Sequence, residues 1–355
     1  MSKSVECALE LQEEVLRAVA EGQPLNLTGG NSKAFYGRPA TGTTLAVNRH
    51  CGVINYEPKE LLLTARTGTP LSEIETLLAE QRQMLAFEPP HFGNHATLGG
   101  TISCGLSGPR RPYAGSARDF VLGVRIINGR GEILRFGGEV MKNVAGYDVS
   151  RLICGSLGTL GILLDVSLKV LPLPESEITL IQERSAAEAI RMVNIWAGQP
   201  LPISATCYDG LKLHIRLSGV PEAVAAGKEM IGGSEAAIDH HFWADIREQR
   251  HPFFHTERPL WRLSLPPQSA PLPLPGKELI DWGGAQRWLL SDASPKRIRS
   301  TAEALGGYAT LFRHAGDNEE VFHPLSAPIK SLHQRLKHAF DPHAILNPGR
   351  LYPDL

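Results

Sequence analysis

The chain has 355 residues, which is enough for two domains, and its formal net charge is −1. A near-neutral chain without a run of Lys or Arg argues against a nucleic-acid partner, which would normally need a concentrated basic face. The five cysteines lie apart, with no C-x-x-C pair, so they encode neither an iron–sulfur cluster nor a zinc finger.

Two helices and a strand are predicted near the N-terminus. Residues 5–21 carry apolar side chains on one face and Glu or Arg on the other, and Gly22 supplies a stop, so we predict an amphipathic helix. Leu61–Arg66 is typical of a strand. Thr69 then offers an N-cap and Pro70 the first position of a second helix.

A β-hairpin and a domain boundary are predicted next. Phe120–Ile127 and Glu132–Phe136 are apolar runs joined by a turn that begins Asn128-Gly129, a pattern typical of a hairpin. Further on, residues 171–174 read Leu-Pro-Leu-Pro, and two prolines interrupt strand pairing. We therefore expect the first domain to end there.

The middle of the chain predicts a separate α+β domain. Residues 185–197 and 221–230 are typical of helices, and 211–217 is typical of a strand between them. Residues 266–276 contain too many prolines for a regular element. We expect this stretch to be an extended surface loop.

Three glycine-rich segments dominate the first half, at residues 25–32, 89–105 and 155–162. Glycine permits positive φ and close approach, so we expect short strands or turns whose free amides hold an anionic ligand. The first segment fits neither GxGxxG nor GxxxxGK[ST], which removes the main support for Rossmann and P-loop sites. Cys104 belongs to the second segment and could therefore contact such a ligand, although a buried core cysteine is the preferred interpretation. Together the segments predict a bound dinucleotide.

These segments carry the motifs of a known family. In order and spacing the chain resembles the FAD-binding domain of the vanillyl-alcohol oxidase (PCMH-type) flavoproteins. The motifs are T-G-G-N-S at 28–32, A-T-L-G-G-T at 96–101, Arg118-Asp119, K-N-V-A-G-Y-D at 142–148 and G-S-L-G-T-L-G-I at 155–162.

The C-terminal residues 340–350 are similar to the closing motif of the D-lactate dehydrogenase and glycolate oxidase branch. The length and both ends look most like the smaller FAD-binding subunits of bacterial glycolate oxidases. The resemblance implies an α+β fold with a two-subdomain PCMH-type FAD-binding domain followed by a smaller cap domain. We place the FAD-binding domain at 1–174, the α+β cap, a substrate or interface domain, at 175–330, and a C-terminal segment that returns toward the FAD domain at 331–355.

The resemblance also implies which residues hold FAD. Some relatives tether the flavin through a His after the first Gly-Gly and a Cys before the later T-x-G. Here Asn31 and His95, or the neighbours of His95, stand at those places, so we expect noncovalent FAD. The expected FAD-binding residues are Thr28, Gly29, Gly30, Asn31, Ser32, Thr97, Gly99, Gly100, Ser103, Gly158, Gly161 and Ile162.

The catalytic residues are not identified by the sequence. Lactate-type relatives place a histidine motif of the form H-x-G-D-G-N-x-H in the second domain. This chain has only His314-Ala-Gly-Asp and His323 at other spacing, so we predict no metal site. His314, His323 and Arg262, a cation able to bind a carboxylate, remain the candidates.

The resemblance implies an FAD-binding subunit of a glycolate oxidase (glycolate dehydrogenase) complex, which oxidises glycolate to glyoxylate and passes electrons to an iron–sulfur partner. A larger flavin subunit would complete the complex. Two alternatives stay open, an autonomous FAD-dependent D-lactate or 2-hydroxy-acid dehydrogenase and a non-catalytic flavin-holding subunit. An NAD(P)H-dependent reductase is a weaker interpretation that the fold does not exclude, and a cofactor-free assembly protein fits the glycine-rich segments less well.

The sequence has no stretch of roughly 18 apolar residues to span a bilayer, and its start lacks the apolar core of a secretory signal. We therefore expect a cytoplasmic protein without a direct membrane span. Peripheral contact with the inner membrane through the partners stays open.

Overall fold

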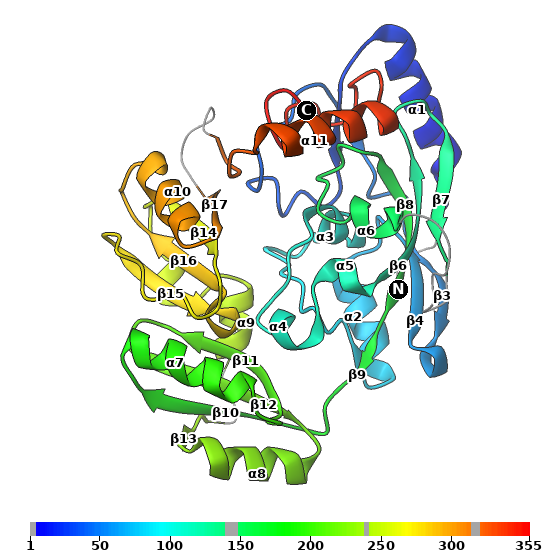
Figure 1. Cartoon of the computed structure of the whole chain (residues 1–355). Helices are drawn as coiled ribbons and strands as arrows, with labels where there is room; N and C mark the ends of the chain where they lie inside the picture. The colour runs from blue at the N-terminus through cyan, green and yellow to red at the C-terminus, as the bar shows by residue number, and fades with distance from the viewer. Residues whose placement is uncertain (1–4, 139–147, 238–240, 314–319) are drawn as a thin grey trace.

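Two β-sheets organise the molecule, one in each half of the chain (Figure 1). The computed structural model describes residues 5–138, 148–237, 241–313 and 320–355. The first sheet has five strands in the order β3-β4-β8-β6-β7, and each neighbouring pair is antiparallel. Its strands are β3 (Val53–Glu57), β4 (Leu62–Arg66), β6 (Val121–Ile127), β7 (Ile133–Gly137) and β8 (Ile162–Lys169).

Short helices cover the first sheet because its strands bury apolar residues. Leu63, Val124 and Val166 pack with residues of the helices in one continuous core. Two-residue strands, β5 and β9, pair beside it. The elements are η1 (Pro58–Glu60), α2 (Leu71–Glu80), β5 (Gln83–Met84), α3 (Leu98–Cys104), α4 (Arg111–Ala114), α5 (Ala117–Phe120), α6 (Val149–Ile153) and β9 (Leu171–Pro172).

The N-terminal helix α1 (Ala8–Glu21) confirms the predicted amphipathic helix. Its buried residues Leu11 and Val15 pack against Leu346 from the end of the chain. Gly22 ends the helix at φ 63°, the left-handed conformation that favours glycine. The chain then enters β1 (Leu25–Thr28), which pairs in parallel with β2 (Thr43–Ala46).

The start of α2 differs by one residue from the prediction. Pro70 is the N-cap itself, and the helix begins at Leu71. Thr69 does not cap the helix, because its hydroxyl donates to the Arg66 carbonyl oxygen and accepts from the Gly52 amide. A tertiary contact therefore competes successfully with the local cap.

The predicted hairpin is present as β6 and β7, with Val124 opposite Phe136. Its turn depends on the Asn128 side chain, whose Oδ1 accepts from the amides of Arg130 and Glu132. Gly131, and not Gly129, takes the left-handed conformation, at φ 76°. The connection is therefore longer than a two-residue Asn-Gly turn.

The second sheet has eight antiparallel strands in the order β13-β10-β12-β11-β15-β16-β14-β17. The predicted strand and the two predicted helices are found here as β12, α7 and α8, and residues 266–276 form no helix or strand. The strands are β10 (Ser176–Glu183), β11 (Ile203–Tyr208), β12 (Lys212–Gly219), β13 (Ser234–Glu235), β14 (Leu260–Ser264), β15 (Lys277–Asp281), β16 (Gln286–Leu290) and β17 (Tyr308–Arg313). The helices are α7 (Ala186–Ala197), α8 (Pro221–Ile231), α9 (Phe242–Arg247), η2 (Pro252–Phe254), η3 (Trp282–Gly284) and α10 (Pro295–Ala304).

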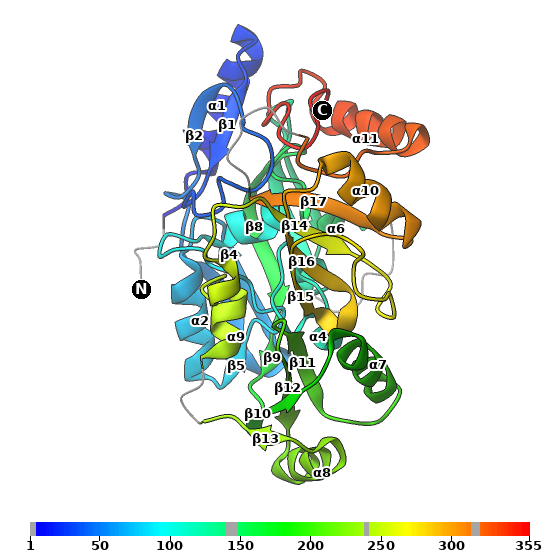
Figure 2. The same cartoon turned by 90° about the vertical axis from the view of Figure 1, so that its left-hand side faces the viewer.

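The two faces of the second sheet have different partners. One face packs under α7, α8 and α10, and α7 and α10 lie on the same side of it in Figure 2. The other face contributes Trp288 and Phe312 to a core that also contains Tyr36 and Leu106 of the first half. The α+β fold is confirmed, and the second sheet is packed against the first half through this shared core.

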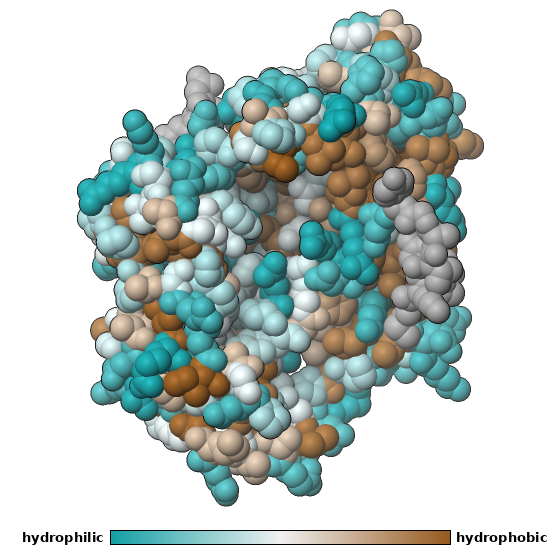
Figure 3. Space-filling view, viewed as in Figure 1, coloured by the Kyte–Doolittle hydropathy of each residue, from teal (hydrophilic) through white to brown (hydrophobic). Residues whose placement is uncertain are grey.

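The last helix, α11 (Ala327–Phe340), lies across the top of the molecule in Figure 1 and contacts the first half. Its Lys337 donates to the Thr159 carbonyl oxygen at 2.9 Å. In the space-filling view (Figure 3), the surface is hollowed below α11, between the two halves. The C-terminal segment therefore bridges toward the part of the chain that carries the glycine-rich segments.

Buried ion pairs also join the two halves. Arg110 of the first half donates to Glu88 at 3.2 Å and to Glu177 of the second sheet at 2.6 Å. Arg216 of the second sheet lies 2.8 Å from the same Glu88 carboxylate. Because each arginine is less than a tenth exposed, this network fixes how the two halves meet.

Asp281 lies next to this network and should make stability fall with rising pH. Burial raises the pKa of Asp281 to about 7, and the Glu88 charge adds to the rise. The folded protein therefore holds a proton that the unfolded chain loses near pH 4, and stability drops between those pH values. Asp281→Asn removes this titrating group. The free energy of unfolding of the variant, relative to that of the wild type, should therefore rise by up to about 1.4 kcal/mol per pH unit across this window.

Urea unfolding of both proteins from pH 4.5 to 8 measures this difference directly. Asp292→Asn is the control, because the Asp292 side chain is 67% exposed. A wild-type-minus-variant difference that does not change with pH would contradict the assignment.

Candidate cofactor-binding site

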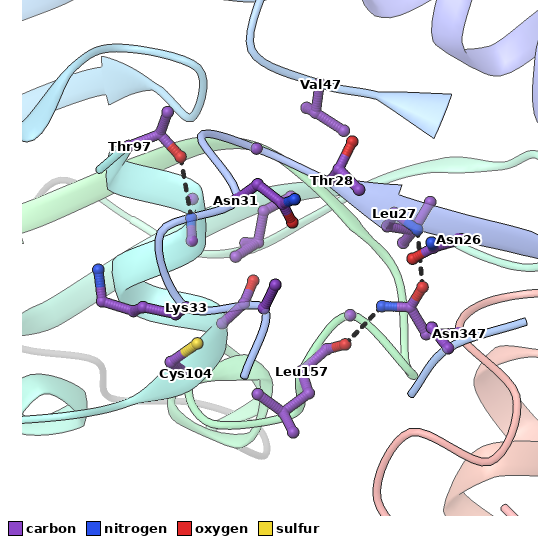
Figure 4. A pocket seen from close by; sticks show the side chains of 18 of the residues that line it. Asn26, Leu27, Thr28, Asn31, Lys33, Val47, Thr97, Cys104, Leu157 and Asn347 are labelled. Carbon is purple, nitrogen blue, oxygen red and sulfur yellow. Dashed lines mark hydrogen bonds between the residues drawn. The ribbon is translucent and has the colours of Figure 1, made fainter. Parts of the chain in front are cut away.

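A pocket of about 530 Å³ opens where β1, α3 and the start of β8 meet (Figure 4). All twelve residues that the sequence predicts as FAD-binding line it. The glycine-rich segments, separated by 56 and 49 residues in the chain, thus come together around one cavity. Other lining residues are Asn26, Leu27, Lys33, Ala34, Pro39, Ala40, Thr44, Val47, Thr67, Cys104, Leu157, Leu163, Asn347 and Arg350.

The first glycine segment is a turn pressed against the second. A Cβ atom on Gly30 would lie 1.3 Å from the His95 carbonyl oxygen, and one on Gly29 would lie 2.6 Å from Thr97 Oγ1. No side chain fits at either position. The turn therefore presents its backbone to the pocket, as an anion-binding turn requires.

The second glycine segment ends in helix α3 (Leu98–Cys104), so the expectation of a short strand or turn was wrong for this part of it, whereas residues 89–97 form no helix. Thr97 caps α3 by accepting from the Gly100 amide, and Leu98 and Ile102 are buried beneath it. Gly99 lets the helix approach the sheet, because a Cβ there would lie 2.8 Å from Thr67 Cβ. The small residues that suggested an irregular loop instead serve close helix–sheet packing.

The third glycine segment is a turn closed by the C-terminal segment. Gly158 has φ 75°, and a Cβ on it would lie 2.8 Å from Asn347 Nδ2. The Asn347 amide joins two walls of the pocket, since its Oδ1 accepts from the Leu27 amide and its Nδ2 donates to the Leu157 carbonyl oxygen, both at 2.7 Å. The C-terminal motif predicted that the chain returns to this domain, but it did not predict that Asn347 joins these two walls.

Arg350 holds the outer wall of the pocket. Its guanidinium donates to the carbonyl oxygens of Arg38, Ala34 and Tyr36. Burial lowers the pKa of Arg350. The side chain thus fixes the stretch 34–38 that follows the first glycine turn.

The charge of the pocket suits an anion. Lys33 and Arg350 line it, and none of the described lining residues is Asp or Glu. Burial raises the pKa of the Cys104 thiol to about 11, so this side chain is uncharged at neutral pH. Cys104 both lines the pocket and packs on the core shared by the two halves.

The candidate catalytic residues lie away from these walls. Arg262 donates to the Tyr36 hydroxyl at 3.2 Å, and neither it nor His323 lines the pocket. His323 Nδ1 accepts from the Ala309 amide, and its Nε2 lies 3.1 Å from Glu303. His314 lies outside the described residues, as do residues 142–147 of the K-N-V-A-G-Y-D motif.

At the two positions where the resemblance places a tether, Asn31 stands where a His is expected and His95 where a Cys is expected. Asn31 lines the pocket at φ 60°, and His95 meets the first turn through its backbone oxygen. In the described parts of the chain there is no cluster of three or more side chains able to hold a metal ion. A helix long and apolar enough to cross a membrane is likewise not found among the described residues.

Comparison with known proteins gives three findings. Residues 4–137 match the family model described as an FAD binding domain. The glycolate oxidase subunit GlcE of Escherichia coli (strain K12) is 52% identical over all 355 residues and over its own full length. The glycolate oxidase subunit GlcD of Bacillus subtilis (strain 168) is 32% identical over 54% of this chain and 40% of its own length.

A solved structure of alkyldihydroxyacetonephosphate synthase has a similar fold. It superimposes with a TM-score of 0.66 over 96% of this chain and 75% of its own, at 16% identity. At that identity the likeness concerns the fold alone. It extends over both halves of the chain.

Proposed function

Because this chain belongs to the family of the glycolate oxidase subunit GlcE, we propose that it is an FAD-binding subunit of a complex that oxidises glycolate to glyoxylate. The complex would also contain a larger flavin subunit and an iron–sulfur subunit. FAD would be bound without a covalent link, in the pocket between β1, α3 and β8.

The observation that carries this proposal is the convergence of three glycine segments on one acid-free pocket. The amides of Gly29–Ser32 suit the pyrophosphate, because a tight backbone turn presents N–H groups to an anion. Thr97, Gly99, Gly100 and Ser103 would line the middle of the cofactor. Gly158, Gly161 and Ile162 would close the site from the opposite side.

FAD, when bound, supplies an acceptor for the hydride of a 2-hydroxy acid. The chain's own part is to hold and orient the cofactor. Asn347 stabilises this arrangement, since it ties the strand that leads into the first turn to the third glycine segment. The five scattered cysteines support an electron relay in another subunit, because the sequence has no C-x-x-C pair.

The first experiment is an anaerobic spectrum of the purified chain, alone and after addition of glycolate or D-lactate. We expect a yellow protein that releases FAD on acid precipitation and stays oxidised until a larger flavin subunit is supplied. Bleaching by substrate alone would identify an autonomous dehydrogenase. A colourless protein that binds no added FAD would contradict the cofactor assignment.

A further inference from the structure

Lys33 is a buried cation without an ion-pair partner among the described residues. Its side chain lines the pocket, and the residue is 6% exposed. The ammonium donates to the His91 carbonyl oxygen at 3.2 Å and lies 3.5 Å from Ser32 Oγ. In the described chain no carboxylate lies within 4.0 Å of it. Burial lowers the pKa of Lys33, which shows that the site penalises its charge.

Another buried lysine of the same chain shows what a purely structural role looks like. Lys337, which is 7% exposed, is bonded to a carboxylate and two carbonyl oxygens, all within 2.9 Å. Buried charges are normally paired in this way. Lys33 has only two neutral partners at longer distances, so its third donor and its charge are free to meet a ligand.

The groups around Lys33 do not neutralise it. The Cys104 thiol is uncharged at neutral pH, because burial raises its pKa to about 11. The Glu248 carboxylate accepts from the amides of His91 and Phe92 and pairs with Arg247, beyond ion-pairing distance of Lys33. The Glu248 charge acts on Lys33 only from beyond ion-pairing distance, so the described residues leave Lys33 able to interact with a charge that develops on a molecule in the pocket.

The place of Lys33 in the pocket indicates which part of that molecule it meets. Lys33 and Cys104 lie on one side in Figure 4, across from Asn347. On that side the pocket borders the aromatic core between the two halves, because Cys104, like Phe35 and Phe92, packs on this buried core. An aromatic ring system fits this border better than a hydrated pyrophosphate, for which the turn amides already provide donors.

We propose that Lys33 lies beside the isoalloxazine ring of FAD, whose N1 and C2 carbonyl edge carries the charge of the reduced form, and that it favours the reduced cofactor. This inference rests on the proposed binding of FAD in the pocket. Reduction by two electrons and one proton leaves a negative charge on that edge of the ring. A buried ammonium beside it stabilises the reduced form more than the neutral oxidised form, and so raises the reduction potential.

The test compares Lys33→Gln with the wild type by FAD titration and by the reduction potential of the bound flavin, measured with a dye and dithionite. In Lys33→Gln, the preference for reduced over oxidised FAD should fall about tenfold, which corresponds to roughly 30 mV for a two-electron couple. Lys33→Arg should keep most of the wild-type potential, because it keeps the charge. Lys330→Gln is the control, since the Lys330 side chain is 49% exposed on α11.

The outcomes separate this inference from the proposed function. An unchanged potential in a Lys33→Gln protein that still binds FAD overturns the role of Lys33 and leaves the cofactor assignment intact. A loss of affinity that is equal for oxidised and reduced FAD assigns Lys33 to the pyrophosphate and also overturns it. If Lys33→Gln does not fold, the reduction potential of Lys33→Arg decides the question. A potential that is roughly 30 mV lower than that of the wild type, although the charge is kept, contradicts the charge effect. A wild-type chain that binds no FAD would instead contradict the proposed function.

Discussion

Gly30→Ala should strongly weaken FAD binding and destabilise the chain even without the cofactor. The new Cβ would be placed 1.3 Å from the His95 carbonyl oxygen, a distance at which the backbone of one segment must move. Overpacking of this kind typically costs 1–3 kcal/mol, and about 3 kcal/mol is expected here because the obstructing atom is backbone. Since the displaced turn carries the amides assigned to the pyrophosphate, FAD affinity should fall by at least about 100-fold.

Urea unfolding of the FAD-free protein and fluorescence titration with FAD measure the two effects separately. Gly198→Ala is the matched control, because Gly198 has φ −88° and a Cβ there would lie 3.6 Å from its nearest neighbour. Its stability should be unchanged or slightly raised. A folded Gly30→Ala protein that binds FAD like the wild type would show that this turn does not hold the cofactor.

Elements with a regular apolar period could be predicted from the sequence. The N-terminal helix, the β6–β7 hairpin and helix α7 each have apolar residues at the spacing of their buried face, and α7 also has the Ser185–Glu188 capping box. Local patterns of this kind identify an element without knowledge of its neighbours. The fold class then followed from the order of these elements and from the family motifs.

Helix α3 could not be predicted because its sequence is adapted to its surroundings. Glycine and serine within it weaken the helical pattern, while Gly99 is required by the approach to Thr67. Helix propensity is a weak signal where tertiary packing decides the conformation. The same competition moved the N-cap of α2 from Thr69 to Pro70.

The pocket residues that the sequence did not reveal act over long distances in the chain. Asn347 bonds to Leu27, 320 residues away, and Lys33 bonds to the His91 carbonyl oxygen, 58 residues away. A local sequence pattern does not reveal a hydrogen bond between residues so far apart in the chain. A glycine-rich motif signals where backbone approaches a ligand, but it does not specify the side chains that other segments bring to the same place.

The second large effect is expected at the buried pair between Lys337 and Asp341. Lys337→Met should lower the free energy of unfolding by about 3–5 kcal/mol, because it leaves the Asp341 charge buried and unpaired. Asp341 is 1% exposed, and its carboxylate lies 2.7 Å from the Lys337 ammonium. The control is the exposed pair between Lys330, on the same helix as Lys337, and Asp354 near the end of the chain, and Lys330→Met should change stability by less than about 1 kcal/mol.

Two further measurements distinguish an unpaired charge from lost packing at Lys337. Adding Asp341→Asn to Lys337→Met should restore part of the stability, because the double variant no longer buries an uncompensated charge. FAD affinity should fall in the single variant, since Lys337 also bonds to the carbonyl oxygen of Leu346, next to the Asn347 that joins two pocket walls. Urea midpoints and FAD titrations of the three proteins test both effects. If Lys337→Met were as stable as Lys330→Met, this buried pair would not be what holds the C-terminal segment against the pocket.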